Sequence, residues 1–414
     1  MKKRTICLIA LIGALSAKAI PSVEIDSVVQ RWPWNNKVDI TYTVADGQDL
    51  VNGTYYKLVF TVTVNGQVNT IDGVFDIGAS ANTGTHTITW TAPSGIKPTT
   101  FTTSAAIYDH DAPSGDDYMV VDLATGKVAY EGLLASQDAS NQRYNTALYK
   151  TDKMVLRKVA AGGTYPTGDS IHYSSGNPSM TWTTDRDYYI GIFMVTQAQW
   201  KKLMGKNPSA CQTEIAGDVV EHRPVEQVAS ITVRGTSTVT PLVPIVADPN
   251  GGFLPRMNAR TGLNFDLPTE VMFEIAARAG ATTAYSWGDT LDYDYIVYSG
   301  IASGSSRAVG SRKPNGWGLY DTSGNMWEYT RDGYIPAGEG TDLESADMSK
   351  KKDPWTPSVG NGVRIWARGG VSHAESETDK NFSRLCMISY RNGIHGGVSG
   401  SNSLSFRVAL VKEP

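Results

Sequence analysis

One stretch in the second half of the chain combines turn residues, aromatic residues and acids in fifteen consecutive positions. It reads Pro314-Asn315-Gly316-Trp317-Gly318-Leu319-Tyr320-Asp321-Thr322-Ser323-Gly324-Asn325-Met326-Trp327-Glu328. Gly, Asn, Asp and Ser favour tight turns, whereas Trp, Leu, Tyr and Met supply side chains for an apolar core. The stretch therefore predicts a turn-rich segment that packs on a core and carries two carboxylates.

Other short strings occur in a fixed order on both sides of this stretch. They are Tyr188 to Trp200, Arg223 to Val228, Leu267 to Gly280, Trp287 to Asp289, Arg368 to Gly370 and Ser405 to Arg407. Two of these strings predict helices. Thr196 with Gln199 is a capping-box pattern, and Gly205 is expected to end that helix. The second helix is expected at about Glu270 to Ala279, with Thr269 as its cap and Gly280 as its stop.

Taken in this order, the strings resemble the formylglycine-generating enzyme family, also called sulfatase-modifying factors, over about Met154 to Leu410. The resemblance implies a compact α+β fold related to C-type lectin domains. It also implies a calcium site formed by the side chains of Asp321 and Glu328 and the backbone carbonyls of Gly324 and Met326. Independently of the resemblance, two carboxylates and turn carbonyls within eight residues are hard oxygen ligands, which suit Ca²⁺ better than zinc or copper.

The family's reaction oxidises a cysteine in a Cys-x-Pro-x-Arg segment to formylglycine, using oxygen and copper held by two enzyme cysteines. The resemblance places those cysteines shortly after Arg368-Gly369-Gly370. Here the segment from Val371 to Ser383 contains no cysteine, and Ala374 and Ser383 stand at about the two positions. Because soft thiolates select Cu(I), their loss argues against copper chemistry. A copper or iron site made of His373, Cys386 and His395 is the remaining alternative, although its spacing matches no known metal pattern.

The segment from Ser389 to Ser405 is rich in Ser, Gly, Asn, Tyr and His and poor in charge. These residue types suit adaptable binding surfaces. Some secreted relatives with this lectin-like fold display a variable C-terminal loop that binds ligands, and the segment resembles it. The predicted ligand-binding residues are Tyr390, Arg391, Asn392, His395 and Asn402. An ordinary turn-rich loop is the alternative.

Residues 20–150 predict an all-β, Ig-like sandwich, followed by the α+β domain at residues 151–414. Val38, Ile40, Tyr42 and Val44 alternate with polar residues. A second alternating run ends at Asn65-Gly66, which is a hairpin turn pair. A third run places His86 on the same face as Ile88 and Trp90. Such runs, separated by turn residues, favour a small antiparallel sandwich that serves as a spacer or a second recognition domain.

The N-terminus has the pattern of a secretory signal peptide over residues 1–19. A basic start precedes the short apolar run from Ile6 to Leu15, and Ala17-Lys18-Ala19 fits the cleavage pattern. We therefore expect a secreted or periplasmic protein that is cut after Ala19. No later segment approaches the length of a membrane span. The 414 residues carry 37 Lys and Arg against 41 Asp and Glu, so no basic excess favours nucleic-acid binding.

Two functions of different classes follow from the sequence. The first is a calcium-stabilised, non-catalytic module that binds a protein or glycan ligand. The second is an oxidoreductase of the formylglycine-generating type, in which a metal and oxygen oxidise a thiol substrate. The missing cysteine pair favours the first function.

Overall fold

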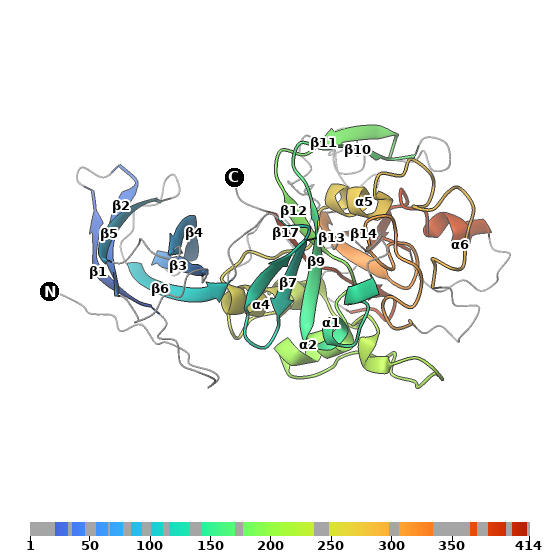
Figure 1. Ribbon diagram of the computed structural model, residues 1–414, viewed down its shortest axis with the longest axis horizontal. Helices are drawn as coiled ribbons and strands as arrows, with labels where there is room; N and C mark the ends of the chain where they lie inside the picture. Colours follow the sequence, from blue (N-terminus) through green and yellow to red (C-terminus); the bar gives the residue numbers. More distant parts are fainter. Residues whose placement is uncertain are drawn as a thin grey trace. The chain divides into compact units, whose positions relative to one another are not determined.

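The computed structural model describes residues 21–31, 35–45, 55–64, 67–77, 84–92, 101–110, 116–132, 142–169, 177–235, 248–297, 306–333, 365–370, 380–394 and 400–411. The chain divides into two compact units, with β1 to β6 in the first and β7 and β9 to β17 in the second (Figure 1). The predicted signal peptide at residues 1–19 lies outside the described residues. In the described part of the chain no helix is long and apolar enough to cross a membrane.

The first unit consists of two three-stranded antiparallel sheets, in the orders β1-β2-β5 and β4-β3-β6. Its strands are β1 (Ser22–Gln30), β2 (Lys37–Ala45), β3 (Tyr55–Val64), β4 (Gln67–Ile77), β5 (Gly84–Thr91) and β6 (Phe101–His110). Both sheets contribute to one core, in which Ile40, Phe60 and Val62 are fully buried. The expected alternation and the hairpin are confirmed, because Val64 lies opposite Gln67 where β3 meets β4. The region is all-β as predicted.

The second unit is built on a five-stranded sheet in the order β17-β12-β9-β7-β8 and a four-stranded sheet in the order β15-β14-β13-β16. A two-stranded sheet, β10 with β11, stands apart from these. The strands are β7 (Tyr118–Asp122), β8 (Val128–Glu131), β9 (Lys153–Val159), β10 (Thr164–Thr167), β11 (Met180–Thr183), β12 (Tyr188–Gly191), β13 (Trp327–Gly333), β14 (Ile365–Arg368), β15 (Asn392–Ile394), β16 (Leu404–Ser405) and β17 (Ala409–Val411). The predicted boundary lies at residue 150, whereas β7 already pairs with β9 in this unit.

Short helices fill the space around these sheets. They are η1 (Gln142–Tyr144), α1 (Leu148–Thr151), α2 (Gln197–Met204), η2 (Val220–His222), α3 (Ser230–Arg234), α4 (Phe253–Thr261), α5 (Glu270–Arg278) and α6 (Lys380–Leu385). The capping box of α2 is confirmed, since the Gln199 backbone N–H donates to the Thr196 hydroxyl and the Thr196 N–H donates to the Gln199 side chain. Gly205 ends α2 in the left-handed region, as predicted.

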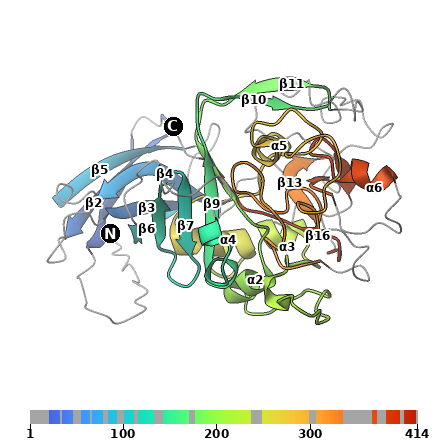
Figure 2. The same ribbon diagram turned by 45° about the vertical axis from the view of Figure 1, so that its right-hand side comes forward.

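Helix α5 lies at the centre of the second unit. Its N-cap is Thr269, as predicted, and every residue from Glu270 to Arg278 is buried. Val271, Met272 and Ile275 share a core with Tyr188 and Ile190 of β12. The pair β10-β11 lies over the same helix in both views (Figures 1 and 2). The helix is therefore enclosed on every face. The helix also ends one residue early, since Ala279 is its left-handed C-cap.

Candidate functional site

The turn segment from Pro314 to Glu328 leads into β13, and hydrogen bonds join it to Arg307 and Gly369. Asp321, Gly324 and Asn325 all have positive φ, at 54°, 85° and 63°. The Asn325 side-chain amide and the Arg307 backbone exchange two hydrogen bonds of 3.1 Å. The Gly324 N–H donates to the Gly369 carbonyl over 2.7 Å. Asn and Asp tolerate the left-handed region better than other side chains, so this composition permits a tight, buried turn.

Asp321 and Glu328 are both buried at the ends of this turn. One Asp321 oxygen, Oδ2, accepts the Gly310 N–H over 2.8 Å, and the other, Oδ1, has no hydrogen-bond partner. Burial raises the pKa of Asp321 and of Glu328, and the Arg407 guanidinium opposes both shifts. A buried carboxylate oxygen without a partner is costly, so Asp321 can accept a further cation.

The four residues predicted to bind calcium come from one short segment and meet two further orphaned oxygens. The Ser323 and Ser405 hydroxyls are buried without a partner, and Ser405 lies beside Glu328 in the parallel pairing of β13 with β16. A Cβ added to Gly369 would stand 3.7 Å from both the Met326 carbonyl oxygen and Glu328 Oε1. These donors are all oxygens, and their chemistry therefore fits a hard cation such as Ca²⁺.

Glu328 already has a partner that the sequence did not reveal. Arg407 Nε and Nη2 each donate to Glu328 over 2.6 Å, and both side chains are fully buried. Arg407 also donates to the carbonyls of Gly191 and Tyr320. Calcium at this segment would therefore share Glu328 with an arginine, using the remaining lone pairs of the carboxylate.

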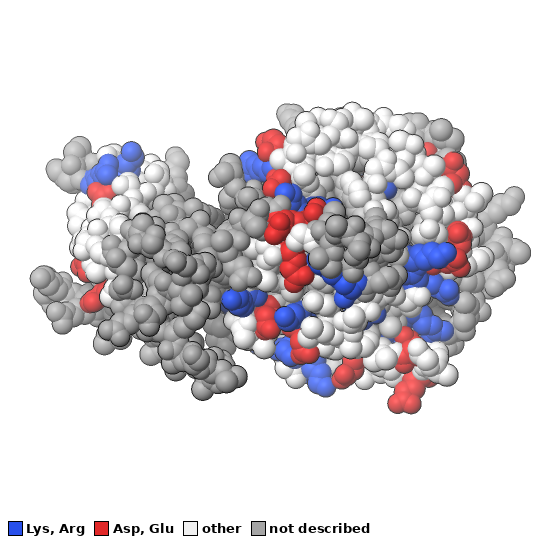
Figure 3. Space-filling view, in the orientation of Figure 1, with Lys and Arg blue, Asp and Glu red and all other residues white. Residues whose placement is uncertain are grey.

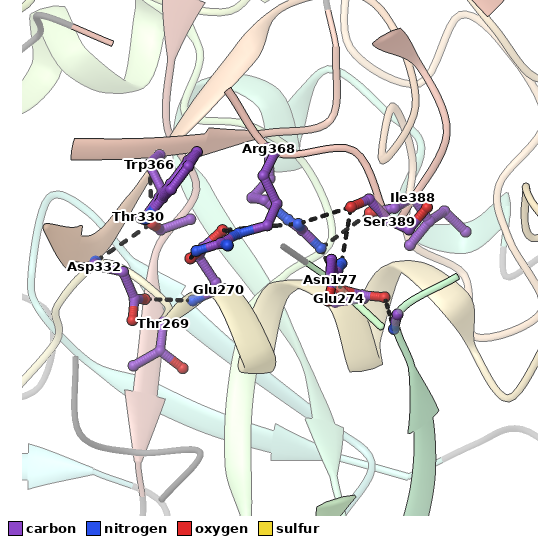
Figure 4. A network of polar contacts seen from close by, with 12 residues as sticks. Asn177, Thr269, Glu270, Glu274, Thr330, Asp332, Trp366, Arg368, Ile388 and Ser389 are labelled. Carbon is purple, nitrogen blue, oxygen red and sulfur yellow. Dashed lines mark hydrogen bonds and ion pairs between the residues drawn. The ribbon is translucent and has the colours of Figure 1, made fainter. Parts of the chain in front are cut away.

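A second buried ion network lies on α5 and joins three parts of the chain (Figure 4). Arg368 of β14 donates to Glu274 and to the Ile388 carbonyl, and Arg278 also donates to Glu274. Asn177 donates to Glu274 and to the Ser389 carbonyl. Burial acts to raise the pKa of Glu274, but Arg368 and Arg278 overcome it, so the pKa lies below its ordinary value. The network holds the segment before the predicted ligand-binding residues against the core.

The predicted ligand-binding residues differ in their surroundings. Arg391 is buried, with its guanidinium bound to both oxygens of Glu270 over 2.8 and 2.6 Å and lying 3.9 Å from the Trp366 ring centre. Tyr390 and Asn392 are half-buried, and Asn402 is exposed. His395 lies outside the described residues. The Tyr390 ring contacts the Trp327 ring at 5.9 Å and the Arg384 guanidinium at 5.6 Å.

The residues of the alternative metal site are only partly described. His373, Ala374 and His395 lie outside the described residues. Cys386 is fully buried in an apolar cluster with Ala284, Tyr285 and Ile296. Neither Cys386 nor Cys211 forms a disulfide. Across the described ranges, no group of three or more His, Cys, Asp or Glu side chains could hold a metal ion.

The surface of the second unit carries both signs of charge. On the face shown in Figure 3, Lys and Arg side chains stand among Asp and Glu side chains. Several are paired, such as Lys313 with Asp294 over 2.6 Å. This mixture agrees with the composition, which gives no support to a phosphate-binding surface.

The fold and this segment define a protein of the sulfatase-modifying-factor class. Residues 142–410 match the family described as the sulfatase-modifying factor enzyme 1-like domain, and the chain belongs to that family. The family resemblance that the sequence suggested is thereby confirmed.

Several known proteins are similar to this chain. The formylglycine-generating enzyme of Streptomyces coelicolor is 31% identical over 151 residues, which are 33% of this chain and 41% of that enzyme. The formylglycine-generating enzyme of Mycobacterium tuberculosis is 34% identical over 137 residues, 30% of this chain and 41% of that enzyme. The chaperone protein LppX of Paenibacillus barcinonensis is 28% identical over 231 residues, 47% of this chain and 76% of that protein.

Two solved structures are similar to part of this chain. Treponema denticola variable protein 1 has a TM-score of 0.46 and 25% identity, covering 62% of this chain and 95% of that chain. PvdO from Pseudomonas aeruginosa has a TM-score of 0.44 and 17% identity, covering 62% of this chain and 94% of that chain.

Proposed function

We propose that this protein is a secreted or periplasmic, calcium-stabilised ligand-binding module that has kept the family fold without its copper chemistry. The observation that carries the proposal is the missing thiol pair. The whole chain has three cysteines, at positions 7, 211 and 386, and none falls between Arg368 and Ser383. A fold does not transfer chemistry without the residues that perform it.

The surroundings of Cys386 support the same conclusion. Its side chain is 0% exposed and lies among apolar neighbours, where a thiol behaves as a small hydrophobic group. A metal ion bound by Cys386 would have to displace apolar packing, since Ala284, Tyr285 and Ile296 belong to the same buried cluster. Cys386 is therefore a packing residue in this proposal.

Calcium would bind at Asp321, Glu328 and the carbonyls of Gly324 and Met326. The support is the buried, unpartnered Asp321 Oδ1, together with the orphaned Ser323 and Ser405 hydroxyls beside the segment. The ion would supply fixed positive charge to a turn that packs against the core. Its role would thus be structural, through binding the native state in preference to the unfolded chain.

The ligand surface would be formed by Tyr390, Asn392, Asn402 and His395. Buried Arg391 would anchor this segment to the core through its ion pair with Glu270. Half-buried Tyr390 between Trp327 and Arg384 is a rigid aromatic anchor of the kind that binding surfaces use. The ligand class would be a protein or a glycan. One similar protein, of which the match spans 76%, is named a chaperone, and we extend a non-catalytic role of this kind to the present chain as part of the proposal.

The second candidate is a formylglycine-generating type of oxidoreductase, which the names of two similar enzymes favour. It would need copper or iron at His373, Cys386 and His395. Since the matches span 41% of those enzymes, their activity is a hypothesis for this chain.

Elemental mass spectrometry of the purified chain, before and after incubation with copper and iron, separates the two functions. The module predicts about one calcium per chain, lost in Asp321→Asn, and no copper or iron after dialysis. Stoichiometric copper or iron, together with oxygen consumption in the presence of a Cys-x-Pro-x-Arg peptide, would establish the oxidoreductase instead. Glu221→Gln, which changes an exposed acid, is the matched control for Asp321→Asn.

A further inference from the structure

Glu226 differs from the other fully buried glutamates of the described chain. Glu270, Glu274 and Glu328 each bind an arginine side chain. Glu226 is also 0% exposed, but it forms no ion pair with any residue that the structure describes. Its Oε1 accepts the Cys211 N–H over 2.7 Å, and its Oε2 has no hydrogen-bond partner. A buried carboxylate without a counter-charge is costly, and burial accordingly raises the pKa of Glu226. A cation bound at Oε2 would stabilise the ionised form of this carboxyl group.

A thiol lies beside this carboxylate. Cys211 is half-buried and free. Burial and the neighbouring Glu226 raise the pKa of the Cys211 thiol, whereas Ser306 and Arg223 act to lower it. The Ser306 hydroxyl is itself buried without a hydrogen-bond partner. Glu226 and Ser306 are thus both neighbours of the Cys211 thiol, and each has a buried side-chain oxygen without a hydrogen-bond partner.

The C-terminal segment completes the cluster with a backbone oxygen. Cys211 Sγ lies 3.9 Å from the Asn402 carbonyl oxygen. This segment is fixed against Glu226 because the Gln227 N–H donates to the Ser401 carbonyl over 3.0 Å. Gly400 packs so closely on Gln227 that an added Cβ would lie 2.3 Å from its carbonyl carbon. Only glycine permits this approach.

One positive charge stands close to the cluster. Arg223 Nη1 donates to the Cys211 carbonyl over 3.1 Å, while Nε lies 2.7 Å from Asp218 Oδ2. The Arg223–Asp218 pair is nearly neutral as a unit. Glu226 therefore leaves the cluster with an excess of negative charge whenever its carboxyl group is ionised.

We propose that Cys211 Sγ, Glu226 Oε2, Ser306 Oγ and the Asn402 carbonyl bind one divalent cation of the Zn²⁺ class. A thiolate beside a carboxylate suits a borderline cation rather than Ca²⁺, and four donors match the coordination number of zinc. Binding forms a metal–sulfur bond and releases the thiol proton to solvent. The site shares no donor with the calcium segment. It shares Asn402 with the proposed ligand surface, but it uses the Asn402 backbone carbonyl, and the metal-binding test needs no ligand.

Cobalt(II) chloride is the probe, because cobalt bound to a thiolate gives a sulfur-to-metal charge-transfer band in the near ultraviolet. We expect the band to saturate at one cobalt per chain and to disappear when zinc is added. Cys211→Ser should abolish the band, and Glu226→Gln should weaken cobalt binding at least ten-fold. Cys386→Ala is the matched control, since it removes the other thiol of the described chain, and it should keep the band.

A chain that gives no band at millimolar cobalt, or a band that survives in Cys211→Ser, would overturn the proposal. So would equal cobalt affinity in Glu226→Gln, because the carboxylate would then be no ligand. If a variant fails to fold, alkylation of the wild-type chain replaces it. Zinc should protect Cys211 from iodoacetamide, as measured by peptide mass, and unchanged alkylation would equally reject the site.

Discussion

Arg407 and Glu328 form an ion pair through two bonds of 2.6 Å, and neither side chain is exposed to solvent. The pair joins Arg407, which lies two residues before β17, to Glu328, the second residue of β13. Arg407 also reaches the carbonyls of Gly191 and Tyr320, so it connects both sheets of the second unit. The final Ser-Phe-Arg string of the sequence is thus part of the core and completes the segment proposed to bind calcium.

Arg407→Met is expected to destabilise the second unit by about 3–5 kcal/mol, because it leaves Glu328 buried without a counter-charge. The double variant Arg407→Met/Glu328→Met should recover part of this loss. Urea denaturation followed by tryptophan fluorescence measures both. Lys313→Ala removes an exposed pair with Asp294 and serves as the control, with little or no change. If Arg407→Met behaves like the control, the pair does not stabilise the fold.

Calcium removal should lower the melting temperature by roughly 5–10 °C, the effect expected of an ion present at about 100 times its Kd. Asp321→Asn should melt at the same temperature with and without chelator, because Asn lacks the carboxylate charge. Differential scanning calorimetry in excess chelator and in millimolar calcium measures the difference. Chelator must lower the melting temperature of the wild-type chain and leave that of Asp321→Asn unchanged. If the wild-type melting temperature does not change, calcium is no part of the proposed function.

Local patterns predicted local structure correctly. Thr196 and Gln199 form the capping box because both partners lie within one helical turn, and Val64 meets Gln67 because a two-residue turn pair separates them. The pairing of β7 with β9 was not predicted, since about thirty residues of chain separate the two strands. Sequence periodicity shows which face of a strand is buried, but it does not show which strand lies beside it.

In the candidate site, too, residues close together in the sequence were predicted, and partners far apart in the sequence were not. The acids at positions 321 and 328 were found because they share one short segment. The arginine that binds Glu328 lies 79 residues away, and the one that binds Glu270 lies 121 residues away. One signal was available, since Glu270 and Glu274 are four residues apart on a helix whose other residues before Arg278 are apolar. Acids at that spacing on a buried helix indicate partners from elsewhere in the chain.

Acid should destabilise the second unit through Glu274, whose folded pKa lies below its ordinary value of 4.5. Because the unfolded chain takes up the proton first, the stabilisation is complete above that value and is lost as the pH falls below it. Glu274→Gln should be less stable than wild type near pH 7, and the difference should shrink as the pH falls from about 4.5. Urea midpoints across this range test it, and a difference that is independent of pH would contradict the assignment.

Thr196→Ala should cost about 1–2 kcal/mol, at the upper end for helix caps because the site is buried. The hydroxyl accepts the Gln199 N–H and donates to the Lys150 carbonyl over 2.6 Å. Thr196→Ser keeps the hydroxyl and is the matched control. Thermal unfolding should rank the chains in the order wild type, Ser, Ala; equal stability of Ser and Ala would show that the methyl group matters more than the cap.

Substitution of Arg391 should lower the stability of the fold, whereas substitution of its neighbour Asn392 should not. Arg391→Met leaves Glu270 buried with Arg368 at 3.7 Å as its remaining ion-pair partner, so it should destabilise the fold by up to about 3–5 kcal/mol. Asn392→Ala and Asn402→Ala alter half-buried and exposed side chains and should leave the melting temperature unchanged. Binding to a glycan array or to surface proteins, measured beside the melting temperature, separates the two effects. If the Asn variants melt as wild type but lose binding, the surface lies at this segment. If all three variants bind as wild type while Arg391→Met melts lower, Arg391 acts only in folding and the ligand binds elsewhere.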